Sequence, residues 1–236
     1  MAVSFAERIQ ALSGFDAGSS SASEIGEDYK DVTAEWMNVA VKEVVNILTP
    51  ALKQKCAQIS IVNATNGTTL DMDGKGEILQ VTRKNADSGY HSPCRKIPAA
   101  YGDASNDSTN MMYYSTATDP VYWIVSNSSD ASTLFVKPTP TDAQPSNVYH
   151  ITYPVFDASG SGSNVNVLTA TSIANFPDEA ENLVVIKAAI IATQYQLAIE
   201  EDVELYGAIL TTLQSDYVST VQAMKAGEIT PLQQGK

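Results

Sequence analysis

The spacing of apolar residues changes twice along this chain, and these changes constrain the fold more than any other feature. Over residues 28–48, apolar side chains recur every three or four positions, as they do in an amphipathic helix. Over residues 59–171 the pattern alternates, and Asn-Gly, Asp-Gly and proline-rich turns separate short segments. Over residues 178–224 the helical spacing returns. This order predicts an α+β protein in which a β region interrupts a helical part.

The predicted helices have recognisable starts and stops. Residues 3–13 form a short amphipathic segment, and a proline after residue 48 ends the longer one before a further turn or two at 51–56. Pro177 fits the first turn of a third helix, because the acidic residues after it suit the positive end of the helix dipole. A fourth helix is expected from about residue 202 to 224, although one long bent helix also fits the pattern.

Short β-rich segments, separated by turns at roughly ten-residue spacing, predict an antiparallel sandwich or barrel. A serine- and glycine-rich stretch at 159–163 closes this region and has the composition of a flexible linker. The expected strands lie at residues 59–61, 78–82, 112–114, 121–125, 134–136 and 148–153.

These patterns divide the chain into parts. We predict that residues 1–56 and 172–227 form a helical bundle from both chain ends, and that this bundle is the part that oligomerises. Residues 57–171 are predicted to form an inserted antiparallel β sandwich or barrel domain, and residues 228–236 an extended C-terminal tail.

The helix expected at 178–199 carries two apolar stripes side by side. A helix that is apolar over so much of its surface has to be buried on two sides. One stripe is expected to pack within the subunit, and the other meets a neighbouring copy or is covered by the β part. Together with the tail, the candidate interface residues are Leu183, Val184, Ile186, Ile190, Ile191, Tyr195, Leu197, Thr230, Pro231 and Leu232.

The charge and the termini exclude several classes of protein. The chain has 27 acidic and 14 basic residues, a formal charge of −13, which disfavours binding to nucleic acid. An acidic surface could nevertheless line a channel through which DNA slides. Glu7 and Arg8 interrupt any signal peptide, and no run approaches the roughly 18 apolar residues of a membrane span. We expect synthesis in a cytoplasm and no membrane partner.

Few residues suggest chemistry. His91 and Cys94 are spaced like half of a zinc site, which only a fortuitous approach of Cys56 and His150 could complete. No calcium loop, phosphate-binding glycine loop or nucleophile motif is complete. We therefore predict that the protein is not an enzyme and has no catalytic residues, no metal site and no cofactor.

Several stretches resemble the head–tail connector proteins, also called adaptor or neck proteins, of tailed bacteriophages. Residues 33–50 are similar to their early helix, which contains a tryptophan and ends at a proline. Residues 134–140 and 148–154 resemble the strand–proline–strand pair of their inserted β part. Residues 176–189, which lead to an acidic turn at 200–205, are similar to their proline-started C-terminal helix.

This resemblance implies a structural virion protein at the neck, made in the host cytoplasm. It would be an adaptor ring, commonly of twelve copies, that joins portal to tail and conducts DNA through its lumen. The implied partners are further copies of the chain, the portal protein and a tail or second neck protein, with DNA only as passing cargo. The helical part would form the ring wall, and the tail at 228–236 could insert into a portal groove.

Aromatic residues along the expected strands leave an alternative of another class. They could form a carbohydrate- or surface-binding platform, as in a β module of a phage tail or a host adhesin. With this alternation, such residues more often pack within a sheet. The residues concerned are Tyr113, Tyr114, Tyr122, Trp123, Tyr149 and Tyr153.

Overall fold

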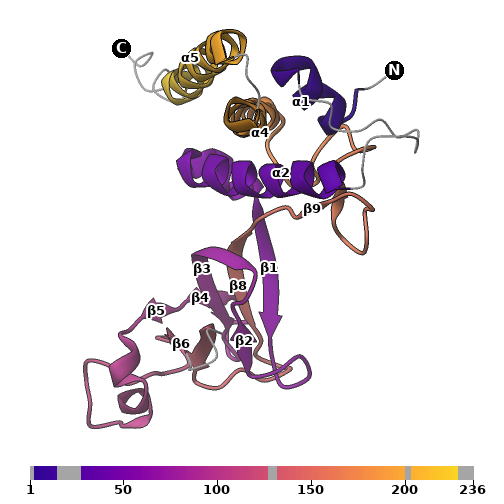
Figure 1. The fold of residues 1–236 in the computed structure, drawn as a ribbon. Helices are drawn as coiled ribbons and strands as arrows, with labels where there is room; N and C mark the ends of the chain where they lie inside the picture. The colour runs from indigo at the N-terminus through magenta and orange to yellow at the C-terminus, as the bar shows by residue number, and fades with distance from the viewer. Residues whose placement is uncertain (1–2, 15–27, 127–131, 200–202, 228–236) are drawn as a thin grey trace. The chain divides into compact units, whose positions relative to one another are not determined.

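The chain forms two compact units, shown in the computed structural model of Figure 1. The first combines residues 1–55 with residues 153–236, and we call it the helical unit; the second, residues 56–152, we call the β unit. The chain contains both helices and mainly antiparallel sheets, so the predicted α+β class is confirmed. The structure describes residues 3–14, 28–126, 132–199 and 203–227.

The helical unit is built around α4. Figure 1 shows α4 with α2 on one side and α1 and α5 on the other, and α4 packs against all three. Two very short strands, β9 and β10, pair in parallel in the same unit. The elements are α1 (Phe5–Ser13), α2 (Asp28–Ile47), α3 (Pro50–Lys55), β9 (Phe156–Asp157), β10 (Val165–Asn166), α4 (Asp178–Ile199) and α5 (Val203–Gly227).

Local capping fixes the ends of α1. The Glu7 backbone N–H donates to Ser4 Oγ at 3.3 Å, and the Ser4 backbone N–H donates to Glu7 Oε2 at 2.8 Å, which together form a capping box. Gly14 ends the helix in the left-handed conformation, with φ of 71°, and its N–H donates to Gln10 O at 2.8 Å. The predicted helix at 3–13 is therefore present with its own stop signals.

The segment 153–171 belongs to the helical unit, not to the β unit as predicted. The Asn38 side chain of α2 makes two hydrogen bonds to the backbone of Phe156 in this segment. Asn38 Nδ2 donates to Phe156 O at 3.0 Å, and Asn38 Oδ1 accepts the Phe156 N–H at 2.8 Å. The Phe156 ring packs edge-on against Phe5 of α1, with centroids 5.8 Å apart. Alternating side chains predicted a continuing β region here, but the segment packs on helices.

The β unit contains two four-stranded sheets. One has the order β1-β8-β3-β4, with antiparallel neighbours; the other has the order β2-β7-β6-β5, in which only the β5–β6 pair is parallel. The strands are β1 (Ala57–Val62), β2 (Thr69–Asp71), β3 (Lys75–Lys84), β4 (His91–Pro93), β5 (Arg95–Lys96), β6 (Val121–Ser126), β7 (Ser132–Lys137) and β8 (Ser146–Thr152).

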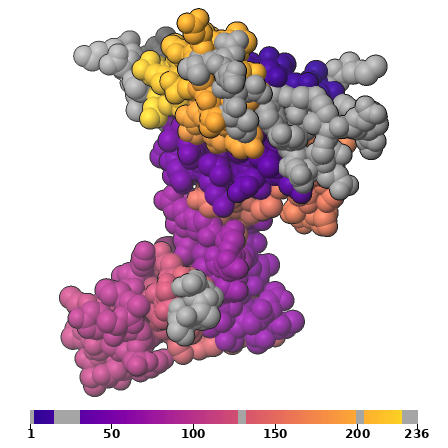
Figure 2. All heavy atoms as spheres, in the orientation of Figure 1, coloured from indigo at the N-terminus to yellow at the C-terminus, as the bar shows by residue number. Residues whose placement is uncertain are grey.

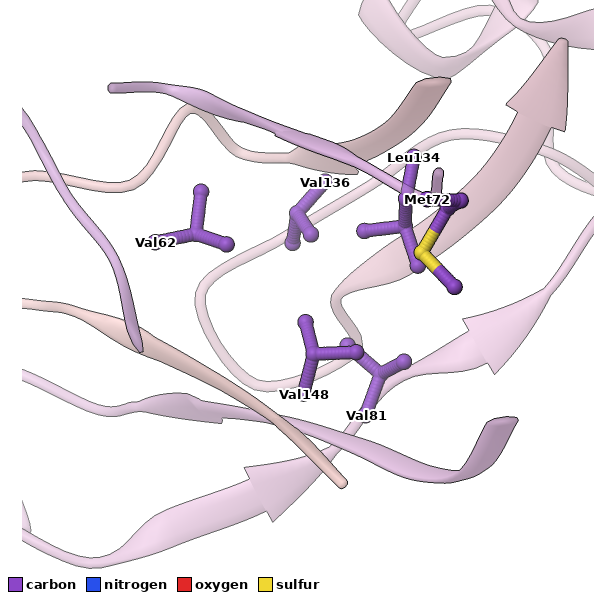
Figure 3. Packing of buried hydrophobic residues seen from close by; sticks show 6 residues of the cluster. All are labelled: Val62, Met72, Val81, Leu134, Val136 and Val148. Carbon is purple, nitrogen blue, oxygen red and sulfur yellow. The ribbon is translucent and has the colours of Figure 1, made fainter. Parts of the chain in front are cut away.

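Residues from both sheets share one hydrophobic core, shown in Figure 3. Leu134 and Val136 on β7 and residues 146, 148 and 150 on β8 are buried, as the alternating pattern predicts for a sheet with one buried face, and Ile151 is buried in addition. The core residues are Val62, Met72, Val81, Leu134, Val136 and Val148.

The prediction of a strand at residues 112–114 is wrong, because this segment forms a turn. Asn110 Oδ1 accepts the backbone N–H groups of Met112 at 3.2 Å and Tyr113 at 3.1 Å, so an asparagine-centred turn replaces the strand. The side chains of Met111 and Met112 are 96% and 68% exposed. The β-prone composition of this segment misled the prediction because local side-chain hydrogen bonds to the backbone decide its conformation.

Candidate interaction surfaces

Most of the apolar surface of α4 is covered within the helical unit. Leu183 and Val184 are fully buried, and Ile186 and Ile190 are 6% and 4% exposed. These four side chains have no surface to offer a neighbouring copy, so the expectation that they form a subunit interface needs correcting. Neither predicted alternative is required, because α1, α2 and α5 of the same chain surround the helix.

The remaining candidate interface residues lie elsewhere on the helical unit or beyond its described part. Ile191 and Leu197 are half-buried, and Tyr195 is 40% exposed although its ring meets Trp36 of α2 at 5.6 Å between centroids. These positions lie in the C-terminal half of α4. Thr230, Pro231 and Leu232 lie outside the described residues.

Polar contacts fix the register of the helices around α4. Lys187 Nζ lies 2.7 Å from Glu43 Oε2 of α2 and 5.9 Å from the centre of the Tyr217 ring of α5. Burial, and secondarily the charge of Glu43, raises the pKa of Tyr217. One lysine on α4 thus links α2 and α5, through an ion pair and a cation–π contact.

The outer surface of the helical unit is formed partly by α5, which Figure 2 shows in the orange-to-yellow range. The apolar residues at helical spacing on α5 form a stripe in which Leu213 is buried and Tyr206, Leu210, Tyr217, Val221 and Met224 are half-buried. Leu205 and Val218 are 53% and 52% exposed. At about 100° per residue they lie on opposite sides of the stripe. The chain leaves apolar side chains uncovered on both flanks of α5.

A groove of about 550 Å³ lies between α1 and α4 in the same unit. Val3 and Leu12, which line it, are 50% and 38% exposed. Arg8 Nη2 donates to Asn182 Oδ1 at 3.4 Å and joins the two walls. The groove is mainly apolar and offers little specific hydrogen bonding.

The four residues considered for a zinc site serve separate roles in the β unit, where His91 Nδ1 lies 3.3 Å from Thr82 Oγ1. His150 is buried, with Nε2 2.9 Å from Ser60 Oγ and Nδ1 3.2 Å from Ile151 O, and burial lowers its pKa. Burial raises the pKa of Cys56 to about 11 and of Cys94 to about 12, so both thiols stay protonated at neutral pH. Over the described ranges, no three His, Cys, Asp or Glu residues are grouped as a metal site requires.

The β unit buries a cation that the sequence pattern did not predict. Arg83 on β3 is 3% exposed, and its Nη2 donates to Gln144 Oε1 at 2.8 Å. Its Nε and Nη1 have no hydrogen-bond partner within the described part of the chain, and neither has Oγ of Ser146, the residue opposite on β8. Burial lowers the pKa of Arg83. Through Gln144, Arg83 links β3 to the loop that precedes β8. Among the described residues, Arg83 forms no ion pair with a carboxylate.

The strand aromatics mostly serve packing. Trp123 is 8% exposed and stacks on Phe135 with centroids 5.5 Å apart. Tyr101 and Tyr113 lie outside the strands and stack on each other with centroids 4.2 Å apart, and Tyr113 packs against the cluster that contains Val121 and Trp123. Trp123, which a carbohydrate platform would use first, is therefore not available to a ligand.

The net charge is concentrated in the helical unit. Residues 1–55 and 153–236 carry 18 of the 27 acidic and 8 of the 14 basic residues, a formal charge of −10, and the β unit carries the other 9 and 6, a charge of −3.

Among the helices that the structure describes, none combines the length and the hydropathy needed to cross a bilayer. A scan against protein-family models and a search of curated proteins both found no match for this chain.

Proposed function

We propose that this chain is a structural subunit of the ring that joins the portal to the tail in a tailed bacteriophage, and that it has no enzymatic activity. The stretches that resemble connector proteins overlap with defined elements: residues 33–50 with α2, residues 134–140 and 148–154 with β7 and β8, and residues 176–189 with the start of α4. The resembling stretches therefore fall largely on regular elements, in the same order along the chain.

The observation that carries the proposal is the pair of uncovered flanks on α5. A cyclic ring needs two different patches on each copy, because every subunit meets one neighbour with one patch and the other neighbour with the other. Leu205 and Val218 provide apolar side chains on two separate faces of one helix. In this proposal α5, rather than the buried stripe of α4, forms the contacts between copies.

The charge distribution supports the same function. A helical unit of charge −10 would give the wall of the ring a surface that repels DNA phosphates, so that DNA slides through without being held. The less charged β unit is left to contact tail components. The protein would be located at the virion neck after synthesis in the host cytoplasm, with the portal and a tail or second neck protein as partners.

The test is the association of the full chain with portal rings of the same phage, measured by mass photometry for three variants. Leu205→Glu and Val218→Glu each place a charge on one flank of α5, and we expect both to reduce the number of bound copies. Val39→Glu, at a 43% exposed position on α2, is the matched control and should bind like the wild type. Equal binding by all three variants would contradict the role of α5.

A further inference from the structure

The β unit has one sheet edge that differs from the others. Three of its edge strands are blunted: β4 has three residues and ends in Pro93, β2 has three residues and includes Asp71, and β5 consists only of Arg95 and Lys96. Short strands, charges and proline are the usual means by which edges avoid pairing with other chains. β1 has six residues, Ala-Gln-Ile-Ser-Ile-Val, without charge or proline.

The open backbone groups of β1 can be assigned from its register. Ala57 lies opposite Ile151, so Cys56 lies opposite Thr152, and the Thr152 N–H donates to Cys56 O at 3.3 Å. Hydrogen-bonded and non-hydrogen-bonded pairs alternate in an antiparallel ladder. The even-numbered residues of β1 therefore bond to β8, and residues 57, 59 and 61 direct their N–H and C=O groups to the free edge. No described strand pairs with that edge.

The side chains at this edge are apolar and exposed. Ile59 and Ile61 are 55% and 50% exposed. An extended, uncharged strand with exposed β-branched side chains and an open backbone edge is a template for strand addition and, if left uncovered, for aggregation. The most complementary partner is another strand that is equally uncharged and apolar.

We propose that two copies of this chain pair through β1, antiparallel and centred on Ile59. Residue 57 of each copy then lies opposite residue 61 of the other, and the two Ile59 residues lie opposite each other. This register uses all three outward-facing residues of each strand. A register centred on Ser60 would require Asn63, whose N–H already donates to Gly67 O at 3.1 Å.

A second copy fits this edge better than the other edges of the β unit do. Self-pairing of β5 would bring arginine and lysine against each other, and self-pairing of β2 would bring the Asp71 carboxylates together, whereas self-pairing of β1 brings no charges together. Ile59 would be covered by its own counterpart and Ile61 by Ala57. The pairing also removes a strand edge that would otherwise promote aggregation of the free protein.

This contact is separate from the proposed ring. It is isologous and closes at two copies, so it cannot by itself build a cyclic ring, whose neighbours meet through two different patches. The inference concerns the β unit and goes beyond the proposed function, which concerns α5. Either can fail while the other holds.

Native mass spectrometry of the full chain tests the pairing. We expect the wild-type mass to be an even multiple of the chain mass, and Ile59→Lys, which places two like charges opposite each other, to halve it. Met112→Lys, at a 68% exposed turn position of the same unit, is the matched control and should leave the wild-type mass unchanged. A monomeric wild type, or an Ile59→Lys variant with the wild-type mass, would overturn the proposal.

A cross-link tests the register without relying on a charged variant. Opposed Cα atoms in a hydrogen-bonded pair lie about 5.5 Å apart, within the range of a disulfide. Mild oxidation should therefore link Ile59→Cys into a covalent dimer. Gln58→Cys should not form one, because its counterpart is displaced by two residues along the strand. Background should be low, because burial suppresses thiolate formation at Cys56 and Cys94. Equal linking of both variants would contradict the register.

If Ile59→Lys is monomeric yet still adds to portal rings, the β1 pairing and the proposed function both stand. If the wild type pairs through β1 but ignores portal rings, only the proposed function fails.

Discussion

The two units of this chain bury their apolar surface with different elements. The helical unit surrounds its most apolar helix, α4, with three others and leaves α5 partly uncovered. The β unit fills the space between two sheets and leaves apolar side chains on the outer side of the edge strand β1. The pattern of apolar residues in an element therefore predicts how much of its surface is buried. It does not predict which neighbouring element buries that surface.

The difference also extends to charge. The helical unit carries most of the net negative charge and pairs some of its charges between helices, as Lys187 does with Glu43. The β unit is closer to neutral, yet it buries Arg83 without a carboxylate partner among the described residues. Comparable substitutions, one in each unit, can show whether the two units unfold independently of each other.

The largest effects are expected from truncating one core residue in each unit. Leu183→Ala in α4 and Leu134→Ala in β7 each remove a fully buried side chain, and we expect each to lower the free energy of unfolding by about 2–5 kcal/mol. Hydrogen exchange should show lost protection mainly in the unit that carries the change. Equal loss in both units after either change would mean that they unfold as one body.

The next largest loss of stability is expected where residues 153–171 pack against α2. Asn38→Ala removes two hydrogen bonds to the Phe156 backbone and should cost about 1–3 kcal/mol. Asn46→Ala, which loses only a 3.4 Å contact from the exposed Tyr153 hydroxyl, is the control and should cost less. Urea denaturation measures both. A smaller loss for Asn38→Ala than for Asn46→Ala would remove our reason for placing 153–171 with α2.

A packing change tests the β unit at a comparable scale. A Cβ added to Gly102 would lie 2.8 Å from the Trp123 ring, so Gly102→Ala forces the indole or the backbone to shift. We expect a loss of about 1–3 kcal/mol and altered tryptophan fluorescence. Gly74→Ala, which meets nothing within 4 Å but has φ of +65°, separates backbone strain from this clash. Unchanged fluorescence in Gly102→Ala would contradict the close approach.

A smaller effect is expected at Arg83. Replacing it with methionine removes a buried cation with two unpartnered nitrogen atoms but leaves Gln144 without its donor, and these changes oppose each other. We expect the free energy of unfolding to change by less than about 1.5 kcal/mol in either direction. Thermal denaturation measures the change. A loss as large as that of Leu134→Ala would show that Arg83 has partners beyond Gln144 and the Thr139 carbonyl oxygen, which lies 3.5 Å from Nη2.

The smallest effect is a pH dependence that arises at Asp157 in the helical unit. A hydrogen bond from Asn164, and further ones from backbone N–H groups of residues 159–161, lower the pKa of Asp157. The carboxylate therefore adds stability that is present above its unfolded pKa of about 3.9 and lost as pH falls through the folded value. Asp157→Asn should flatten this acid limb of the stability profile. An identical limb in both proteins would exclude Asp157 as its source.

The sequence was sufficient where local signals decide the structure. The amphipathic spacing over residues 3–13, the proline before α4, and the alternation on β7 and β8 each predicted an element that the structure contains. These signals act within a few residues, so they do not depend on the rest of the fold.

Prediction failed where a distant partner or one side chain decides the outcome. The stretch 159–163 has the composition of a linker, yet the Asp157 carboxylate accepts hydrogen bonds from its backbone and orders a turn. An aspartate just before a serine–glycine run was the available signal. Nothing in the alternation of β3 indicated that Arg83 would be buried, because its partner Gln144 lies 61 residues away.

The central claim is that the chain forms a closed ring on the portal. The most direct test is the mass that the wild-type protein adds to purified portal rings of the same phage, divided by the chain mass of 25.2 kDa. A closed ring should add one fixed whole number of copies at saturation, independent of any further excess of protein. Portal rings that gain no mass, or that gain a variable number of copies, would contradict it.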